Sequence, residues 1–419
     1  MSDTKRLTIL FLQGHPSRFW SALGDGLDAA GHRVLKINFS LGDRVFWRRK
    51  GAVDYRGRMG KWAAWLADFI RTNGVTDIYY YADRLPYHAE ALEISRSLGV
   101  RCWAIEFGYL RPDWLTFEPE AMGARSLFPK TREGIAARAE RHVLPDLRPR
   151  YHHTFSEEAF GEVTFALLSE VGRPAYPFYR SDRYYWPGFD YLAWLVVLAG
   201  ELRAKRRAGE VEARLMRENA PYNMVAMQLQ QDYQIRASSP YDHLEEFLEE
   251  IVSSFAKHAP ADRRLLFKMH PLDNGLENWP RRLKRLEKRY GIVGRTDLIR
   301  GGDLGNLIRS SQGVIYVNST VGLHCIMNRK PSIAMGSAVF DIDGLTHQGG
   351  IDSFWRDPEP VDGPFLELFL RALMDIQVRG TFYGEEGREA AIAEIVRRMD
   401  ALAESGETGY GLPPLPLAH

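Results

Sequence analysis

Two long parts of the chain alternate short apolar runs with stretches of helical periodicity, and this alternation is the strongest constraint on the fold. In the first part, strands are predicted at residues 7–12, 32–38, 77–81 and 101–105, with helices at 19–30, 60–73 and 88–98. In the second part, strands are predicted at 224–228, 264–269, 313–317 and 332–335, with helices at 243–258, 279–290, 304–310 and 320–328. Such alternation implies βαβ units and parallel sheets, whose ligands bind at the carboxyl ends of the strands.

A chain of 419 residues fits two domains better than one. We predict an N-terminal α/β domain over residues 1–215, in which 126–215 is an aromatic and basic linker region without a clean βαβ rhythm. A C-terminal α/β domain follows over 216–382, closed by a helix at 365–378, and residues 383–419 form a last helix and tail. Two doubly wound, Rossmann-like domains that face a cleft are the GT-B glycosyltransferase plan, which we expect here by analogy.

The composition excludes several classes of function. The formal net charge of +1 does not support bulk binding of nucleic acid, because that requires a strong basic excess. Cys102 and Cys325 lie in apolar stretches, so we expect no disulfide framework and a reducing compartment. No Cys/His cluster has metal-ligand spacing, and no GxxxxGK[ST] loop occurs. We therefore expect no metal, no bound cofactor and no NTPase activity.

No segment of the sequence is typical of secretion or membrane insertion. No small-residue cleavage site follows the apolar run 7–12, which reads as a first strand. The apolar run 191–200 is about half of the roughly 20 residues that span a bilayer. We expect a cytoplasmic protein, unless it is held at a membrane surface.

Two strand ends of the second domain carry side chains that suit an anion. Lys268 and His270 stand at the end of strand 264–269, where they could meet a nucleotide phosphate. Asn318, Ser319 and Thr320 begin a helix, whose free N–H groups and positive dipole end suit a phosphate. Each feature alone is equally consistent with a structural turn or a simple helix cap. Because both lie at strand ends of one sheet, a single phosphate could touch both.

Two carboxylates at strand ends are candidates for catalysis. Asp232 follows the first strand of the second domain, with Arg236 nearby, and Glu106 follows a strand of the first domain, with Arg111 nearby. An acid in such a position can act as base, nucleophile or metal ligand, and it can equally be a solvated loop carboxylate. Paired carboxylates from two domains are what sugar transfer through a covalent intermediate requires.

The end of the first strand is a further candidate site. Gln13 and His15 flank Gly14, and a glycine permits close approach of a ligand. An acceptor could bind to Gln13 and His15, although a plain βα turn explains the same residues.

Four motifs, in order along residues 106–323, resemble those of a known family. They are EFGYLRP at 106–112 with Thr116 and Glu118, QLQQDYQIR at 228–236, KMHPLD at 268–273 and NSTVGL at 318–323. Each motif is weak alone, but the ordered set is specific. The chain resembles the capsule polysaccharide proteins of the KpsS and KpsC type, and within them the single-module KpsS kind.

This resemblance implies a retaining β-Kdo transferase with a GT-B-like fold that uses CMP-Kdo, where Kdo is an acidic deoxy-octulosonic sugar. It implies a (lyso)phosphatidylglycerol acceptor, on which the first Kdo starts a lipid linker for capsule export, and other capsule biosynthesis proteins as partners. Carried over to this sequence, it implies that Asp232 is the nucleophile of a covalent Kdo–aspartate intermediate and that Glu106 is the acid/base.

The resemblance also implies a CMP phosphate site at His270 and at Asn318-Ser319-Thr320, with Lys268 as a weaker candidate. An imidazole and a helix N-terminus can offset the charge of the leaving group without a metal. The carboxylate of Kdo requires a cation, which Arg236 or Arg111 could supply.

A lipid acceptor also gives a reason for the aromatic and basic stretch 176–207. The stretch contains Trp186, Tyr191, Trp194, Arg203, Lys205, Arg206 and Arg207. Aromatic anchors beside basic residues suit an anionic membrane surface, and an ordinary interdomain helix with a solvated charged end fits equally well. Two other functions stay open: transfer of a different nucleotide-activated sugar, and a non-catalytic export or assembly factor.

Overall fold

A computed structural model divides the chain into two compact units, each built on its own sheet. Unit 1 comprises residues 1–129, 135–182 and 370–419, and unit 2 comprises residues 130–134 and 183–369. The structure describes residues 6–151, 154–185, 187–232, 235 and 238–406. The chain passes between the units within α5 (Arg132–Ala139) and within α14 (Gly363–Ala372).

The sheet of unit 1 has the strand order β12-β6-β5-β4-β1-β2-β3. Its strands are β1 (Thr8–Phe11), β2 (Arg33–Asn38), β3 (Val53–Asp54), β4 (Asp77–Tyr81), β5 (Arg101–Phe107), β6 (Trp114–Pro119) and β12 (Gln377–Arg379). The predicted parallel pairing is confirmed for β1, β2, β4 and β5. The short strand β3, which was not predicted, is parallel to β2, whereas β6 is antiparallel to β5 and to β12. The antiparallel edge was not predicted, because β12 finds its partner through the tertiary fold rather than through a local pattern.

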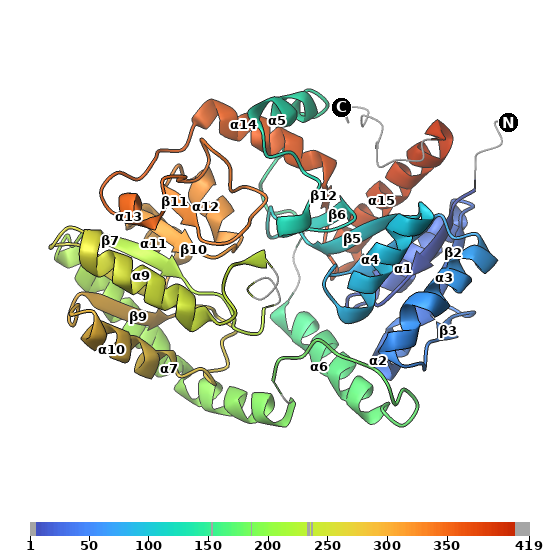
Figure 1. Cartoon of the computed structure of the whole chain (residues 1–419), viewed down its shortest axis with the longest axis horizontal. Helices are drawn as coiled ribbons and strands as arrows, with labels where there is room; N and C mark the ends of the chain where they lie inside the picture. The colour runs from blue at the N-terminus through green and yellow to red at the C-terminus, as the bar shows by residue number, and fades with distance from the viewer. Residues whose placement is uncertain (1–5, 152–153, 186, 233–234, 236–237, 407–419) are drawn as a thin grey trace. The chain divides into compact units, whose positions relative to one another are not determined.

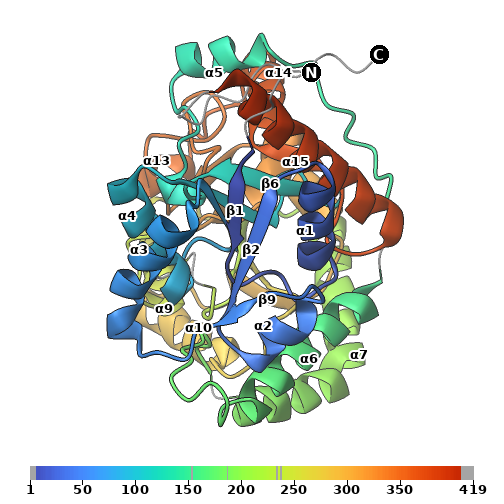
Figure 2. The ribbon, with the colours of Figure 1, turned by 90° about the vertical axis from the view of Figure 1, so that its right-hand side faces the viewer.

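Helices cover both faces of the unit 1 sheet. They are α1 (Phe19–Ala29), α2 (Leu41–Phe46), α3 (Trp62–Asn73), α4 (Pro86–Leu98), α6 (Phe155–Val171) and α15 (Glu385–Ser405), with 3-10 turns at Met59–Lys61, Gly123–Arg125 and Leu373–Asp375. Figure 2 shows α1 and α15 on one side of the sheet and α3 and α4 on the other. Each side has its own buried apolar cluster, which fixes the sheet between two layers of helices.

The C-terminal end of the chain corrects two predictions. The helix predicted at 365–378 ends at Ala372, and Gln377–Arg379 is a strand instead. The last helix, predicted as a segment apart, belongs to unit 1 and packs Met399 and Leu402 into the cluster with Phe19. Buried Arg398 on α15 explains the arrangement, because it donates to the main-chain oxygens of residues 374, 375 and 377 and so ties β12 to the helix.

Unit 2 contains a wholly parallel sheet in the order β11-β10-β7-β8-β9, as the second alternating pattern predicts. Its strands are β7 (Tyr222–Ala226), β8 (Arg264–Met269), β9 (Thr296–Arg300), β10 (Gly313–Tyr316) and β11 (Ser332–Ala334). Its helices include α7 (Pro187–Arg217), α9 (Leu244–His258), α10 (Trp279–Arg289), α11 (Leu304–Ser310), α12 (Val321–Met327) and α13 (Ile351–Phe354). Figure 1 shows α9 and α10 in front of this sheet.

The boundary predicted at residue 215 lies within α7 of unit 2, so the predicted domain limits differ from the observed ones. α7 belongs to unit 2 because it packs along that sheet: Arg214 donates to Asp297 of β9 at 2.6 Å, and Asn274 donates to Asp190 at 2.8 Å. Among the described residues, no helix has the length and hydropathy required to cross a membrane.

Candidate functional site

The carboxyl ends of β7 and β10 are joined by a pair of amide side chains. Gln228 follows β7 and Asn318 follows β10, and these strands are neighbours in the unit 2 sheet. Gln228 Nε2 donates to Asn318 Oδ1 at 2.8 Å, and the main-chain N–H of Asn318 donates to Gln228 Oε1 at 2.9 Å. Because Gln228 is buried, this bridge fixes the two strand-end loops against each other. Gln228 belongs to a motif that the sequence singled out, but its partner was not predicted.

The bridge holds the turn that begins α12. Asn318 also donates from Nδ2 to the carbonyl of Ser238 at 3.3 Å, so its amide serves the loop structure. Ser319 Oγ accepts from the N–H of Val321 at 3.2 Å, while Thr320 makes no side-chain capping bond in the described part of the chain. Both Ser319 and Thr320 are partly exposed. The predicted helix start is confirmed, and its hydroxyls lie at the carboxyl edge of the sheet.

His270 stands at the end of β8, which is the neighbour of β7 on the other side. Its ring is partly exposed, and its Nδ1 accepts from the N–H of Leu272 at 3.1 Å. A nitrogen that accepts carries no proton, so the neutral ring has its proton on Nε2. His270 can therefore donate from Nε2 without first becoming charged.

The loop that carries His270 is fixed by Asp273. The N–H of Asp273 donates to the His270 carbonyl at 3.1 Å, and its carboxylate accepts from Trp279 Nε1 at 2.8 Å and from Arg300 at 3.3 Å. Asp273 is buried, so the strand-end position of His270 is set by a rigid loop.

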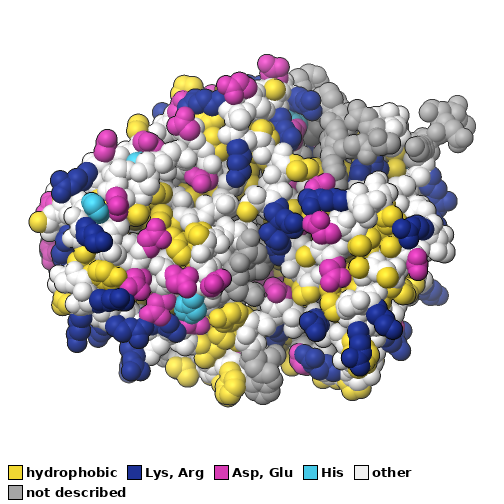
Figure 3. All heavy atoms as spheres, viewed as in Figure 1, with side chains coloured by type: hydrophobic (Ala, Val, Ile, Leu, Met, Phe, Trp, Pro, Cys, Tyr) yellow, Lys and Arg dark blue, Asp and Glu magenta, His cyan; other side chains and the backbone are white. Residues whose placement is uncertain are grey.

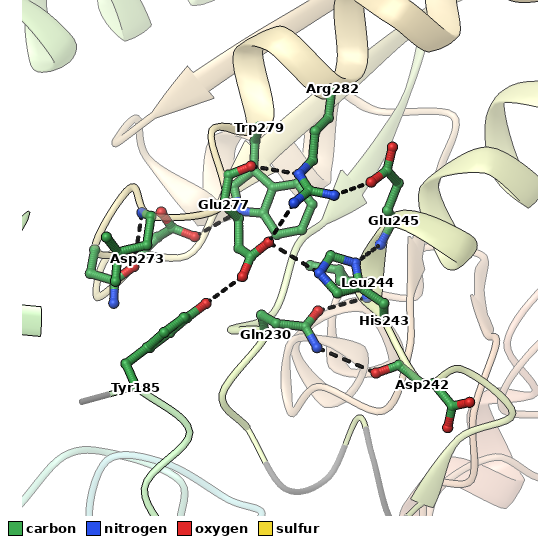
Figure 4. Close-up of polar contacts among 12 residues, drawn as sticks. Tyr185, Gln230, Asp242, His243, Leu244, Glu245, Asp273, Glu277, Trp279 and Arg282 are labelled. Carbon is green, nitrogen blue, oxygen red and sulfur yellow. Dashed lines mark hydrogen bonds and ion pairs between the residues drawn. The ribbon is translucent and has the colours of Figure 1, made fainter. Parts of the chain in front are cut away.

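A second polar network, which the sequence did not reveal, surrounds buried Glu277 (Figure 4). Its carboxylate accepts from the Tyr185 hydroxyl at 2.6 Å, from Arg282 at 3.0 Å and from His243 Nε2 at 3.1 Å. His243 uses Nδ1 to cap α9, accepting from the N–H of Glu245 at 3.0 Å. The network ties the start of α9 to the loop after β8. The sequence shows the polar residues at 270–282, but it does not show their partners Tyr185 and His243, which lie far away along the chain.

Lys268 lies on the opposite face of β8 from Phe267, which packs in the core under α9 and α10. Its ammonium donates to the carbonyl of Gly301 at 2.7 Å, and burial lowers its pKa. In this arrangement Lys268 holds the end of β9, so its predicted contact with a donor stays a prediction.

Asp232 lies in the loop after β7, four residues beyond the amide bridge. Its side chain is partly exposed, and its main chain forms turns with Leu229 and Ile235. Arg236, predicted to assist it, lies outside the described residues. The structure thus places Asp232 on the strand-end loop that the sequence predicts, and its catalytic role stays a prediction.

Two acids, Glu106 and Glu118, lie on β5 and β6 near the carboxyl edge of the unit 1 sheet. Glu106 is a partly buried residue of β5 that pairs in register with Thr116, and the next register pair on the same face is Ala104 with Glu118. Glu106 and Glu118 therefore lie on one face of the two strands as diagonal neighbours. Glu118 is fully buried and accepts from the Tyr109 hydroxyl at 3.1 Å and from Ser126. Burial raises the pKa of Glu118 to about 8, so its carboxyl is mostly protonated at pH 7.

Asp83, just after β4, is a second buried acid of unit 1 that the sequence analysis missed. It is 1% exposed, and burial raises its pKa to about 6, against the opposing effect of Arg84, whose Nε lies 3.5 Å away. Nearby His88 donates from Nδ1 to the carbonyl of Ala82 at 2.9 Å, and burial lowers its pKa to about 4. The sequence feature that could have revealed Asp83 is an acidic residue that follows the buried strand β4.

The two predicted acceptor residues of unit 1, His15 and Gln13, differ in their exposure to solvent. His15 is 1% exposed, stacks on Phe382 at 4.2 Å and contacts the hydroxyl of Tyr383 at 3.2 Å, so it packs rather than faces a ligand. Gly14 makes room for Trp20, whose ring would lie 2.3 Å from an added Cβ. These contacts fit the alternative of a structural βα turn at His15, because its ring is closed to solvent.

Gln13 and Arg111 remain accessible at the same edge of unit 1. Gln13 is partly exposed and accepts from the Tyr179 hydroxyl at 3.2 Å. Arg111 is exposed and lies over the ring of Phe107, with its guanidinium carbon 5.3 Å from the ring centroid. Of the two arginines predicted to pair with the carboxylate of an acidic sugar, Arg111 is therefore the one that lies within the described residues.

Metal and thiol chemistry find little support in the described residues. No group of three or more His, Cys, Asp or Glu side chains is placed there to hold a metal ion, and transfer without a metal stays a prediction. Cys102 and Cys325 are both buried as free thiols, and burial raises the pKa of Cys102 to about 12. A thiol with so high a pKa is a poor nucleophile.

The two units define the class of protein: each is an open α/β unit with polar side chains at the carboxyl edge of a largely parallel sheet. The sequence matches the family described as "Capsule polysaccharide biosynthesis protein" over residues 76–383, and the chain belongs to this family.

Curated relatives match nearly the whole chain. The "Capsule polysaccharide export protein KpsS" of Escherichia coli is 29% identical over 89% of this chain and 96% of its own length. The "Capsule polysaccharide modification protein LipB" of Neisseria meningitidis is 27% identical over 90% of this chain and 92% of its own length. Among solved structures, the chain is similar to "Thermosulfurimonas dismutans KpsC, beta Kdo 2,7 transferase", with 15% identity, a TM-score of 0.46 and coverage of 93% of this chain and 99% of that one.

Proposed function

We propose that this member of the capsule polysaccharide biosynthesis family is a retaining glycosyltransferase that transfers β-Kdo from CMP-Kdo to (lyso)phosphatidylglycerol. The observation that carries the proposal is the polar edge of the unit 2 sheet, where Gln228 and Asn318 are bridged and Nδ1 of His270 accepts from the N–H of Leu272. Family membership and the ordered motifs shared with the KpsS and KpsC type support the choice of sugar and acceptor.

The donor phosphate binds at this edge in our proposal. CMP-Kdo has one phosphate between the sugar and the nucleoside, and its negative charge grows as CMP leaves. His270 donates to it from Nε2, and the Ser319 and Thr320 turn contributes hydroxyl and main-chain donors. Lys268 supports the site from behind by holding the end of β9. Neutral donors in a fixed frame stabilise the leaving group at little reorganisation cost.

Sugar transfer then takes two displacements. The Asp232 carboxylate forms a bond to the anomeric carbon of Kdo, the bond from that carbon to the phosphate oxygen breaks, and CMP leaves with the electron pair. The acceptor hydroxyl next attacks the same carbon, its proton passes to Glu106, and the Asp232 carboxylate is released. Two inversions retain the configuration. The proposal requires Glu106 and Asp232 to reach one sugar, with Arg111 or Arg236 pairing with its carboxylate and Gln13 on the acceptor side.

The acceptor places the working enzyme at an anionic membrane surface, where its substrate is found. A second candidate function follows from the name of the Escherichia coli relative, which describes an export protein. An export factor would bind the lipid or its glycan without forming product. Assays with CMP-Kdo or a UDP-sugar, each with phosphatidylglycerol or phosphatidylcholine, separate these functions by the product that forms.

Trapping the intermediate tests the mechanism. Full-length Glu106→Gln is incubated with CMP-Kdo and digested, and we expect mass spectrometry to find Kdo on the peptide that contains Asp232. Asp232→Asn should form no adduct and should lose about 10³-fold or more in kcat, because a covalent path needs its nucleophile. Asp242→Asn removes an exposed carboxylate of the same unit and should keep wild-type activity. Wild-type turnover by Asp232→Asn, or an adduct on another residue, contradicts the assignment.

A further inference from the structure

The N-terminal half of α7 exposes an unusually apolar side. Six large hydrophobic side chains, 57–83% exposed, lie within fourteen residues: Phe189, Leu192, Leu195, Val196, Leu198 and Leu202. We call this set the α7 apolar face. With 3.6 residues per turn, these positions share one half of the helix circumference. Figure 3 shows hydrophobic side chains gathered at the lower edge of the view, where Figure 1 places this part of α7.

The opposite side of α7 is already occupied by unit 2. Asp190 accepts from Asn274 at 2.8 Å, Val197 lies beside Gly275, and Ala208 is buried beside Gly301. These three positions recur every seven or eleven residues, so they form one packed stripe along the helix. The packing leaves the apolar face turned away from the sheet of its own unit.

The same side of α7 becomes basic beyond Leu202. Arg203, Arg206 and Arg207 are exposed and continue the turn positions of the apolar face. The acidic residues of 187–207 are Asp190 and Glu201, and both are partly buried on the packed side or its border. One helix therefore presents about four turns of apolar surface followed by a cationic turn. Within that turn, Arg206 is paired with exposed Glu210 at 3.0 Å, whereas Arg203 and Arg207 have no ion pair with an acid in the described part of the chain.

We propose that the α7 apolar face lies in the surface of an anionic lipid bilayer, with Arg203 and Arg207 at the phosphate headgroups. Aliphatic side chains without polar atoms gain from the acyl boundary, and adjacent cations gain from anionic headgroups. The inference deepens the proposed function and rests on its lipid acceptor. It also changes which residues make the contact: Trp194 is partly buried, and Trp186 lies outside the described residues.

Charge separates α7 from α6, a second helix with several exposed apolar residues. α6 in unit 1 exposes Phe160, Leu167 and Val171, but every charged residue within α6 is a glutamate. An anionic surface would repel that helix. The bilayer proposal therefore applies to α7 alone.

Vesicle co-sedimentation of the full chain tests the proposal. We expect the wild type to bind phosphatidylcholine vesicles that contain about one third phosphatidylglycerol, and to bind pure phosphatidylcholine more weakly. Leu195→Ser combined with Leu202→Ser should weaken binding to the mixed vesicles about tenfold or more, because apolar burial drives insertion. Arg203→Glu combined with Arg207→Glu should remove the preference for phosphatidylglycerol.

Two control variants make the same kinds of substitution at exposed positions outside α7. Val293→Ser replaces another exposed apolar residue of unit 2, and Arg141→Glu with Arg148→Glu makes the same change of charge in unit 1. Both should bind vesicles as the wild type does. The proposal would be overturned if the controls lost as much binding as the α7 variants, or if the α7 variants bound as the wild type does. It would also be overturned if the serine variant had a lower melting temperature, or if light scattering showed that it had lost a wild-type dimer.

The outcome can be separated from that of the proposed function. An acceptor with the glycerophosphoglycerol headgroup and no acyl chains needs no membrane, so the α7 variants should keep wild-type transfer to it. If the wild type binds vesicles through α7 but forms no Kdo product, the proposed function fails and the membrane contact stands.

Discussion

The carboxyl edges of the two sheets differ in how their polar side chains are held. In unit 2, the amides of Gln228 and Asn318 are bridged, and Nδ1 of His270 accepts from a main-chain N–H, which makes Nε2 the donor nitrogen of a neutral ring. In unit 1, Gln13 and Arg111 are accessible at the edge, while Glu118 on the neighbouring strand β6 is so deeply buried that its pKa rises to about 8. The comparison teaches that the same α/β architecture can present donors for an anion in one unit and carboxyls that hold protons in the other. Fold alone therefore does not assign a role to either edge.

The largest effect is expected from replacing His270, which tests whether the edge of unit 2 binds the donor nucleotide. His270→Ala removes the Nε2 donor, and we expect CMP to bind about tenfold to hundredfold more weakly, because a hydrogen bond to a charged group is lost. Isothermal titration calorimetry measures the change. His258→Ala removes another partly exposed histidine of the same unit, which pairs with Asp352, and should bind CMP normally. Unchanged CMP affinity in His270→Ala would remove the imidazole from the donor site.

Breaking the amide bridge tests whether the edge of unit 2 is a rigid frame. Gln228→Ala and Asn318→Ala, alone and combined, form a double-mutant cycle in urea unfolding. We expect a coupling free energy of about 1 kcal/mol or more, because removing one partner leaves the other without its buried hydrogen bonds. A coupling near zero would show that each amide is held independently of the other.

The smallest expected effect concerns the buried acid of unit 1. The pKa of Glu118 is raised in the folded state, so the folded protein binds more protons than the unfolded chain between the ordinary range of a glutamate and about pH 8. Wild-type stability should therefore fall as pH rises through that window. Glu118→Gln has no proton to lose, and its melting temperature should exceed that of the wild type by about 2 °C more at pH 8 than at pH 5.5.

An exposed acid of the same unit provides the control for this measurement. Glu140→Gln should follow the pH dependence of the wild type, because Glu140 is exposed. If Glu118→Gln shows the same slope as the wild type in differential scanning fluorimetry, Glu118 is charged in the fold and the contrast between the two edges disappears.

Much of the candidate site could be predicted from the sequence, because a parallel sheet converts local strand ends into a shared edge. Lys268, His270 and the turn at 318–320 were found in this way, and all lie where strands end. Burial could not be predicted in the same way. His15 and Asp83 each follow a strand as His270 does, yet both are 1% exposed. His15 is closed off by Phe382 and Tyr383, which are far along the chain, so distant packing partners rather than the residues at a strand end decide whether that end is open.

The sequence by itself determined the alternation of strands and helices, the parallel sheets and the order of the motifs, because hydrophobic periodicity and turn residues act over short distances. Only the tertiary structure decided that β12 pairs with β6, that Gln228 meets Asn318 and that α7 turns its apolar side outward. These pairings join residues far apart along the chain. They depend on which surfaces the packed layers bring together, and no local pattern carries that information.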